Sequence, residues 1–146
     1  MILILYATYT GYTREVAGLL CHNLTKAFPG VKFALMNARD MDPSKFQNYR
    51  LVLFGASTWD DGLNPDTKDF LKRLERIELN GQSFALFGLG DRQFLVFCAA
   101  LPTIEAKLKS LGANVLSPAF TFDNYQSGQD INQFIDWAKN IVTEFS

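Results

Sequence analysis

The chain has 146 residues, a length typical of one domain, so we expect residues 1–146 to form a single folded unit. Its hydrophobic content of 48% is typical of a globular protein. Its net charge is −1 and no basic stripe stands out in the sequence, so nothing indicates a nucleic acid as a partner. The two cysteines, Cys21 and Cys98, are far apart in the sequence, and the single histidine, His22, cannot complete a zinc site with them, so we expect free thiols in a cytoplasmic protein. No apolar run has the length of a membrane span.

Short apolar runs alternate with helical patterns along the whole chain. Strands are predicted at residues 2–7, 31–37, 50–57, 82–90 and 114–122. The first, third and fourth runs are almost continuously apolar, which is typical of strands covered on both faces. Apolar residues spaced by three and four predict helices over 16–27, 70–77, 97–111 and 131–145, while residues 42–49 form a brief helical turn at most.

This alternation predicts an α/β fold with a parallel sheet and right-handed crossovers. Ligands of such a doubly wound domain bind beyond the carboxyl ends of the strands. We therefore expect the functional residues in the loops that follow Ala7, Ser57 and Leu89.

The first of these loops, TYTGYT at residues 8–13, lies between a predicted strand and a predicted helix. Backbone amides at a helix start lack partners, and the helix dipole adds partial positive charge, so this position favours an anion. Gly11 allows a close turn, and the hydroxyls of Thr8, Thr10 and Thr13 can each donate a hydrogen bond. The loop is suited to a phosphate held without a cation, although a threonine-rich helix cap without any ligand explains the stretch almost as well.

The pattern T-x-T-G-x-T after a buried strand resembles the phosphate loop of the flavodoxins. The stretches STWDDGLNPDTKDF at 57–70 and GLGDRQFLVFCAAL at 88–101 resemble the second and third flavin loops of that family. The three loops match in order and spacing, so the resemblance covers nearly the whole chain. It implies a flavodoxin-like, doubly wound five-stranded sheet of order 2-1-3-4-5 with helices on both faces. The short path from Leu116 to the last helix is typical of short-chain members.

The resemblance implies an FMN site at these loops. Trp59 would cover one face of the flavin ring and Phe94 the other, and Asp91, Val96 and Cys98 would bind its pyrimidine edge through backbone groups. Trp137, on the apolar side of the last predicted helix, is assigned to packing. The implied FMN-binding residues are Thr8, Tyr9, Thr10, Gly11, Tyr12 and Thr13 at the phosphate, and Ser57, Thr58, Trp59, Asp60, Asp61, Gly62, Leu89, Gly90, Asp91, Phe94, Val96, Phe97 and Cys98 at the ring.

The resemblance also implies the function of a low-potential one-electron carrier and not of an enzyme. FMN would cycle mainly between a neutral semiquinone and an anionic hydroquinone, with a flavodoxin or ferredoxin reductase as the electron donor and redox enzymes as acceptors. We expect a monomer. Two alternatives stay open at this point: an NAD(P)H-dependent flavin or quinone reductase, and a flavodoxin-like accessory module without a redox role.

Three features depart from the family pattern. Asp60 stands where a glycine normally allows a peptide flip on reduction, and a non-glycine residue at positive φ costs about 1–2 kcal/mol, somewhat less for Asp. Phe94 replaces the usual Tyr and offers no hydroxyl. The near-neutral net charge of −1 predicts weak long-range steering toward a basic reductase.

Overall fold

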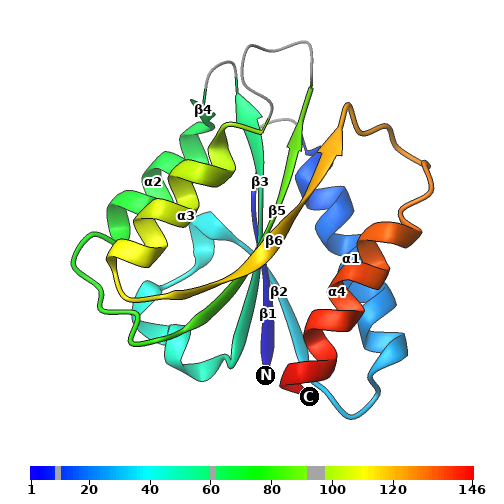
Figure 1. Ribbon diagram of the computed structural model, residues 1–146, viewed down its shortest axis with the longest axis horizontal. Coiled ribbons are helices and arrows are strands. Elements are labelled where there is room, and N and C mark those ends of the chain that lie inside the picture. Colours follow the sequence, from blue (N-terminus) through cyan, green and yellow to red (C-terminus); the bar gives the residue numbers. More distant parts are fainter. Residues whose placement is uncertain (9–10, 60–61, 92–97) are drawn as a thin grey trace.

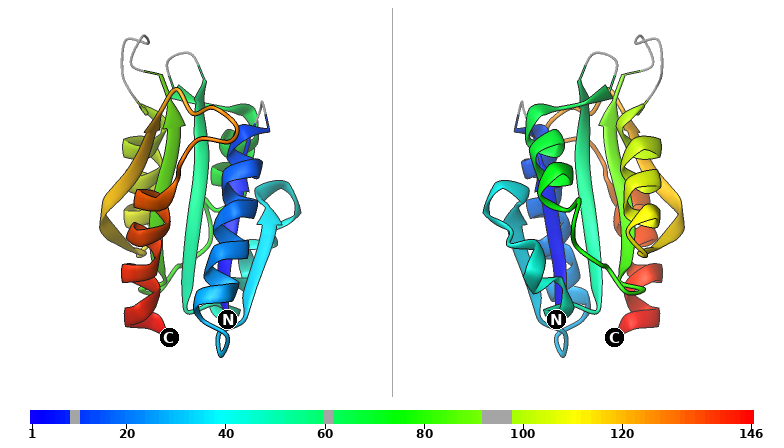
Figure 2. Two further views of the ribbon diagram at one scale, coloured as in Figure 1. Left: turned by 90° about the vertical axis from the view of Figure 1, so that its right-hand side faces the viewer. Right: turned by 90° about the vertical axis from the view of Figure 1, so that its left-hand side faces the viewer.

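The structure is a computed structural model that describes residues 1–8, 11–59, 62–91 and 98–146, and at Trp59 the backbone only. Its centre is a parallel sheet of β1 (Ile2–Ala7), β2 (Phe33–Asn37), β3 (Leu51–Trp59), β5 (Ser83–Gly90) and β6 (Asn114–Asp123). Helices α1 (Tyr12–Ala27) and α4 (Asn132–Phe145) cover one face, and α2 (Pro65–Arg73) and α3 (Ala100–Ser110) cover the other (Figure 1). Both termini lie at the end of the sheet opposite the carboxyl ends of its strands (Figure 2).

The strand order is β2-β1-β3-β5-β6, which is the predicted 2-1-3-4-5 order of the long strands. The α/β doubly wound fold is therefore confirmed. A two-residue strand, β4 (Gly62–Leu63), has no counterpart among the predicted strands and pairs antiparallel with the end of β3, where Gly62 lies opposite Trp59. Two residues are too few to produce a periodic pattern in a sequence, so this hairpin could not be predicted.

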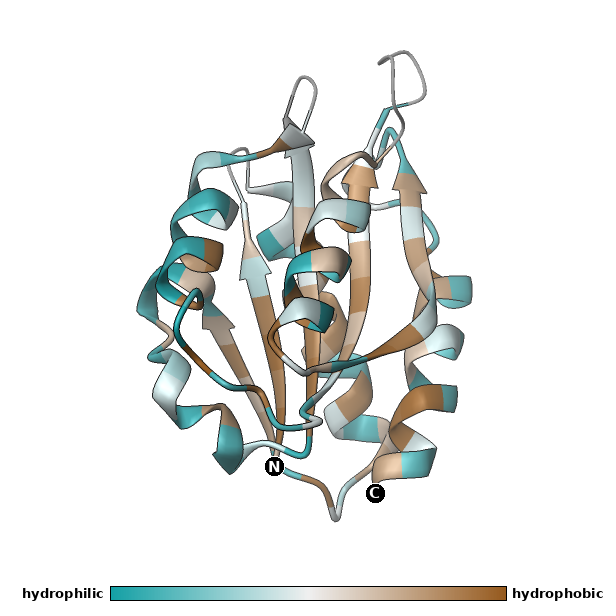
Figure 3. Ribbon diagram, turned by 60° about the vertical axis from the view of Figure 1, so that its left-hand side comes forward, coloured by the Kyte–Doolittle hydropathy of each residue, from teal (hydrophilic) through white to brown (hydrophobic). Residues whose placement is uncertain are grey.

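The apolar strands are buried on both faces, as predicted. Successive side chains alternate between the two faces, so Ile4 of β1 packs in the core beneath α1 and α4, and Leu5 packs in the core beneath α2 and α3. Leu53 and Phe54 of β3 divide in the same way. Hydrophobic residues accordingly concentrate in the central strands, while hydrophilic residues occur mainly on the helices and turns (Figure 3). Burial of this apolar surface is the main source of stability.

Helix α2 lies earlier in the chain than its apolar spacing predicts. It begins at Pro65 and ends at Arg73, so the prediction of a helix over 70–77 is wrong at both ends. The Leu74 amide is shared between Phe70 O and Leu71 O, both at 3.2 Å, and beyond it the bonds join residues three apart, as from the Ile77 amide to Leu74 O at 2.9 Å. The Arg73 guanidinium donates to Met41 O at 2.6 Å. Long-range contacts thus fix the helix end while Ile77 continues to pack against the core from a turn.

The other element boundaries differ from the predictions by few residues. Leu111 and Ile131 flank α3 and α4 as cap residues. Strand β2 begins at Phe33, and the brief turn predicted over 42–49 corresponds to the 3₁₀ helix η2 (Pro43–Asn48), which follows η1 (Ala38–Asp40). None of the helices in the described part of the chain combines the length and the apolar character that a membrane crossing requires.

Trp137 has the packing role that its position in the sequence predicts. Its indole stacks on the Phe134 ring with centroids 5.8 Å apart, on the same helix. The indole Nε1 donates to Pro118 O in the edge strand β6 at 2.9 Å, which ties α4 to that strand. Trp137 is therefore satisfied within the fold, and it lies on a helix rather than in one of the three loops.

Candidate functional site

The three predicted loops start side by side at the carboxyl edge of the sheet. The register places Ala7 of β1 opposite Ala56 of β3, and Ser57 of β3 opposite Leu89 of β5. Because neighbouring strands lie about 4.8 Å apart, the first and third loops begin about 10 Å from each other with the second between them. A single ligand of nucleotide size can therefore contact all three loops.

The first loop leads directly into α1. Gly11 is the N-cap of this helix with a φ of 94°, in the left-handed region that glycine adopts without penalty. A Cβ at this position would meet nothing within 4 Å, so the backbone angle and not crowding requires the glycine. The Gly11 amide donates to Thr8 Oγ1 at 2.9 Å, which closes the loop on itself. Within the described residues no side chain caps α1, so its first amides are available to an anion.

Thr13 provides the strongest indication of a ligand at this loop. The residue is fully buried in the first turn of α1, and its Oγ1 has no hydrogen-bond partner within the described residues. A buried hydroxyl without a partner costs about 1–3 kcal/mol, and almost all such groups in native proteins are paired. An anion bound at the helix start would supply the missing acceptor. The first loop therefore fits the phosphate of FMN.

A second group of polar residues lies beside the start of α1. Tyr12, which is exposed, contacts the ring of Tyr125 edge to face with centroids 5.9 Å apart. Ser127 Oγ donates to the Glu15 carboxylate at 2.9 Å. The Tyr125 hydroxyl is buried without a hydrogen-bond partner among the described residues, and burial, reinforced by Glu15, raises the pKa of Tyr125 above its usual value. These contacts connect the loop after β6 to the first turn of α1.

The second loop begins at the end of β3. Ser57 and Thr58 are half-buried, and Thr58 Oγ1 accepts a long hydrogen bond of 3.4 Å from the Ala100 amide at the start of α3. The backbone of Trp59 continues β3 and pairs with Gly62 of β4. The predicted residues Ser57, Thr58, Trp59 and Gly62 thus lie at the carboxyl edge, next to the first loop.

Asn64 is a residue beside the candidate site that the sequence prediction missed. Its side chain is fully buried and forms hydrogen bonds with the ends of both β1 and β3 and with the first turn of α2. The sequence carries a signal for part of this role, because Asn followed by Pro at the first helical position is typical of a helix start. The contacts to the two strands depend on tertiary structure and leave no local pattern.

The third loop begins at the end of β5. Leu89 is buried and the Gly90 carbonyl accepts from the Asn124 amide at 2.7 Å, which ties this loop to the end of β6. Cys98 is buried with a φ of 50°, which is uncommon for a residue other than glycine. A Cβ at Gly90 would lie 2.9 Å from Cys98 Sγ, so only glycine fits over this thiol. The half-buried Asp91 completes the described part of the loop.

The remaining predicted contacts lie outside the described residues and stay predictions. They are Tyr9, Thr10, Asp60, Asp61, Phe94, Val96, Phe97 and the side chain of Trp59. The structure thus brings together the beginnings of all three loops and the end of the third, and it describes the phosphate end of the candidate site more fully than the ring end.

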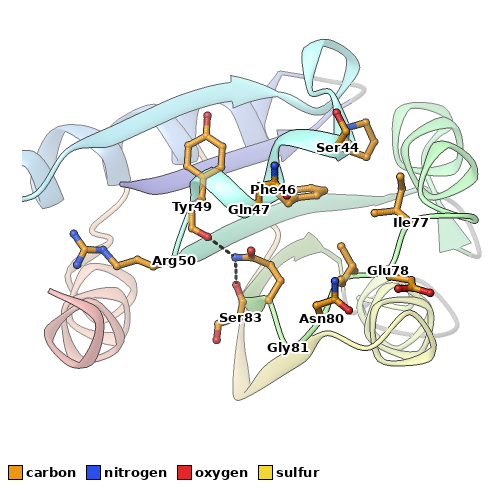
Figure 4. Close-up of a pocket in the computed structure, with 13 residues that line it drawn as sticks. Ser44, Phe46, Gln47, Tyr49, Arg50, Ile77, Glu78, Asn80, Gly81 and Ser83 are labelled. Carbon is orange, nitrogen blue, oxygen red and sulfur yellow. Dashed lines mark hydrogen bonds between the residues drawn. The ribbon is translucent and has the colours of Figure 1, made fainter.

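A cavity of about 410 Å³ lies at the opposite, amino edge of the sheet, beside the residues that precede β3 and β5 (Figure 4). Two hydrogen bonds join residues that line it: Gln82 Nε2 donates to Tyr49 O at 2.9 Å, and the Gln82 amide donates to Leu79 O at 2.7 Å. Among the described residues that line it, none has a buried side-chain N or O atom without a hydrogen bond. This cavity is separate from the three loops.

Comparison with known proteins identifies relatives that match nearly the whole chain. The flavodoxin family profile matches residues 4–137. The chain is 34% identical over 143 residues to probable flavodoxin 2 of Bacillus subtilis, covering 97% of this chain and 93% of that protein. It is 31% identical over 146 residues to a flavodoxin of Maridesulfovibrio salexigens, with 96% and 95% covered. The crystal structure of oxidised flavodoxin 2 from Bacillus cereus superimposes with a TM-score of 0.82 at 29% identity, covering 99% and 96% of the two chains.

Proposed function

Because the chain belongs to the flavodoxin family and is an FMN-binding electron carrier rather than an enzyme, we propose that its three carboxyl-edge loops divide the cofactor between them. The first loop holds the 5′-phosphate, and the second and third loops hold the flavin ring. FMN, when bound, supplies the one-electron redox chemistry. The protein binds it, orients it and sets the polarity around it.

The unpaired hydroxyl of Thr13 is the single observation that carries this assignment. In our proposal Thr13 Oγ1 donates to the phosphate, together with the amides of the first turn of α1 and the hydroxyls of Thr8 and Thr10. Neutral donors suffice because hydrogen bonds to a charged acceptor are about twice as strong as neutral ones. The helix dipole adds further attraction for a dianion.

The proposed position of the flavin ring rests on the family match and on the described residues at which the second and third loops begin. Trp59 and Phe94 would cover the two faces of the ring, since aromatic stacking contributes about 0.5–1.5 kcal/mol beyond area burial. Asp60, Asp61 and Asp91 would place negative charge near the ring. One unit charge at about 4 Å contributes roughly 1–4 kcal/mol between the limits of water and a protein surface, which opposes the addition of electrons.

We propose that the protein is a monomer in the cytoplasm and that it receives electrons from a reductase. Cys21 and Cys98 pack against the cores on opposite faces of the sheet, so the fold separates the two thiols. This separation favours a protein that functions without a disulfide, as is usual in the cytoplasm. The charged residues nearly balance, with 14 Lys and Arg against 15 Asp and Glu, so association with a partner should depend only weakly on salt.

The test of this function is a titration of the purified apoprotein with FMN, followed by reduction in steps. We expect a yellow complex that takes up electrons one at a time from a chemical reductant or from a reductase with NADPH. NADPH alone should reduce it at no useful rate. Rapid reduction by NADPH alone would favour the alternative of an NAD(P)H-dependent reductase, and failure to bind FMN would contradict the proposal as a whole.

A further inference from the structure

Asn64 makes contacts that join three parts of the carboxyl edge. Its Nδ2 lies 3.2 Å from Ala7 O at the end of β1 and 3.0 Å from Ser57 O at the end of β3. Its Oδ1 accepts from the Thr67 amide at 2.9 Å and from Thr67 Oγ1 at 3.1 Å. Asn64 and Thr67 are both fully buried. A single side chain therefore links the residues immediately before the first and second loops to the first turn of α2.

The chemistry of these partners fixes the orientation of the Asn64 amide. The backbone carbonyls of Ala7 and Ser57 can only accept, and the Thr67 amide can only donate, so the nitrogen must face the strands and the oxygen must face α2. Ser57 Oγ, at 3.1 Å from Nδ2, can accept as well. A carboxylate of the same size could cap α2 but would repel both carbonyls. The position therefore requires an amide, which a helix cap alone does not.

From this geometry we propose that Asn64 is a positioning residue that sets the separation of the first and second loops, and hence lets one FMN molecule reach both. The inference rests on the proposed placement of the phosphate at the first loop and of the ring at the second. Asn64 itself touches neither part of the cofactor in this scheme. It acts through Ala7, which precedes Thr8, and through Ser57, which precedes Thr58.

Loss of the Asn64 side chain should affect the binding of FMN more than the binding of riboflavin. Riboflavin lacks the phosphate and needs only the loops around the ring, whereas FMN must satisfy both ends at once. If Asn64 sets the distance between the loops, its loss must reduce the gain in affinity that the phosphate provides, measured as the ratio of the riboflavin Kd to the FMN Kd. A residue that only stabilises α2 would leave this ratio unchanged.

The experiment uses Asn64→Asp, which keeps the size and the helix cap, and Asn64→Ser, which keeps a cap without introducing a charge. For each variant, the Kd of FMN and of riboflavin is measured by flavin fluorescence, with circular dichroism as the check of folding. We expect the Kd ratio to fall about tenfold in both variants, equivalent to about 1.4 kcal/mol, with less than about a threefold change for riboflavin. If Asn64→Asp does not fold, Asn64→Ser decides.

Thr67→Val is the matched control. It removes only the hydroxyl that donates to Asn64 Oδ1 and leaves the amide cap and both strand contacts in place. We expect a lower unfolding temperature with an unchanged Kd ratio. An unchanged ratio in the folded Asn64 variants, or an equal fall in the Thr67→Val control, would overturn the positioning role. Absence of FMN binding by the unaltered protein would instead refute the proposed function, so the two failures are distinguishable.

Discussion

The two edges of the sheet differ in whether their polar groups have hydrogen-bond partners. At the amino edge, turns and side chains pair with one another: the Arg50 amide donates to Met1 O at 3.1 Å, and Gln82 Nε2 donates to Tyr49 O at 2.9 Å. At the carboxyl edge, α1 has no side-chain cap and Thr13 Oγ1 is buried without a partner among the described residues. Both edges belong to the same strands, so the difference does not follow from the strand order.

This contrast shows how a ligand site can be distinguished from a cavity. The amino edge has a cavity of about 410 Å³, but its buried polar side chains have partners among the described residues. The carboxyl edge leaves hydrogen-bonding capacity unused at the helix start, where an anion would complete it. In our proposal the unpaired hydroxyl of Thr13, rather than the size of a cavity, therefore indicates the site.

The largest effect is expected for Thr13→Val, which tests whether the unpaired hydroxyl belongs to the phosphate. Loss of a hydrogen bond to a charged group costs about 1.5–3 kcal/mol, so the FMN Kd should rise roughly ten- to hundredfold. The affinity for riboflavin and the stability of the apoprotein should not fall, since the apoprotein loses only an unsatisfied hydroxyl. Fluorescence titration and thermal unfolding of the apoprotein provide the two measurements.

The matched control at the amino edge is Gln82→Met, which removes the bond to Tyr49 O and keeps the length of the side chain. It should lower the free energy of unfolding by about 1 kcal/mol and leave the FMN Kd unchanged. The comparison of the two edges would be wrong if Gln82→Met weakened FMN binding as strongly as Thr13→Val does.

The next largest effect is expected at the third loop. In Gly90→Ala the new methyl group would lie 2.9 Å from Cys98 Sγ and 3.1 Å from the Cys98 amide nitrogen, so the loop end must shift. We expect the affinity for FMN and for riboflavin to fall together by about tenfold, because in our proposal this loop holds the ring. The second variant Gly90→Ala/Cys98→Ala should recover part of that loss. Equal affinities of wild type and Gly90→Ala would show that the third loop tolerates the shift.

A smaller effect is expected at Asp60, which lies outside the described residues, so the prediction rests on the sequence. If Asp60 disfavours the peptide flip by about 1 kcal/mol, Asp60→Gly should raise the first one-electron couple by about 40 mV. Asp60→Asn should act mainly on the second couple, because it removes charge and keeps the backbone restriction. Potentiometric titration separates the two couples, and an unchanged or lowered first couple in Asp60→Gly would contradict the strain account.

The smallest effect concerns Tyr125, whose unpaired hydroxyl also lies near α1 but faces Glu15. Burial raises its pKa above the usual value of about 10, so the unfolded chain loses this proton at a lower pH than the folded protein. The stabilising contribution is complete below pH 10 and is lost as the pH rises through the higher folded pKa. Tyr125→Phe should therefore lose less stability above pH 10 than the wild type, by under about 1 kcal/mol.

Denaturant unfolding of the Tyr125→Phe variant and the wild type at pH 8 and above pH 10 provides the measurement. The FMN Kd should not change in this variant, because the hydroxyl belongs to the contacts between α1 and the loop after β6. A clear loss of FMN affinity would place Tyr125 in the cofactor site and would weaken the distinction between the two unpaired hydroxyls.

Local patterns were sufficient for most of the fold. The continuous apolar runs predicted β1, β3 and β5. The Thr/Gly loop before α1 was a candidate phosphate loop from its own residues, while the assignment of FMN to it came from the family resemblance. The end of α2 was not predictable, because the apolar spacing continues to Ile77 while the bond from Arg73 to Met41 O comes from a distant part of the chain. Strand β4 has too few residues to show a period.

The sequence by itself determined which segments become strands and helices, where the loops lie and what chemistry the first loop offers, because these depend on neighbouring residues. Only the tertiary structure decided that Asn64 joins the strand ends before two loops, that Cys98 requires a glycine at position 90, and that the hydroxyl of Thr13 has no partner among the described residues. Each of these facts depends on which atoms meet after the sheet has formed. Hydrogen bonds between residues far apart in the chain leave no periodic trace in the order of the amino acids.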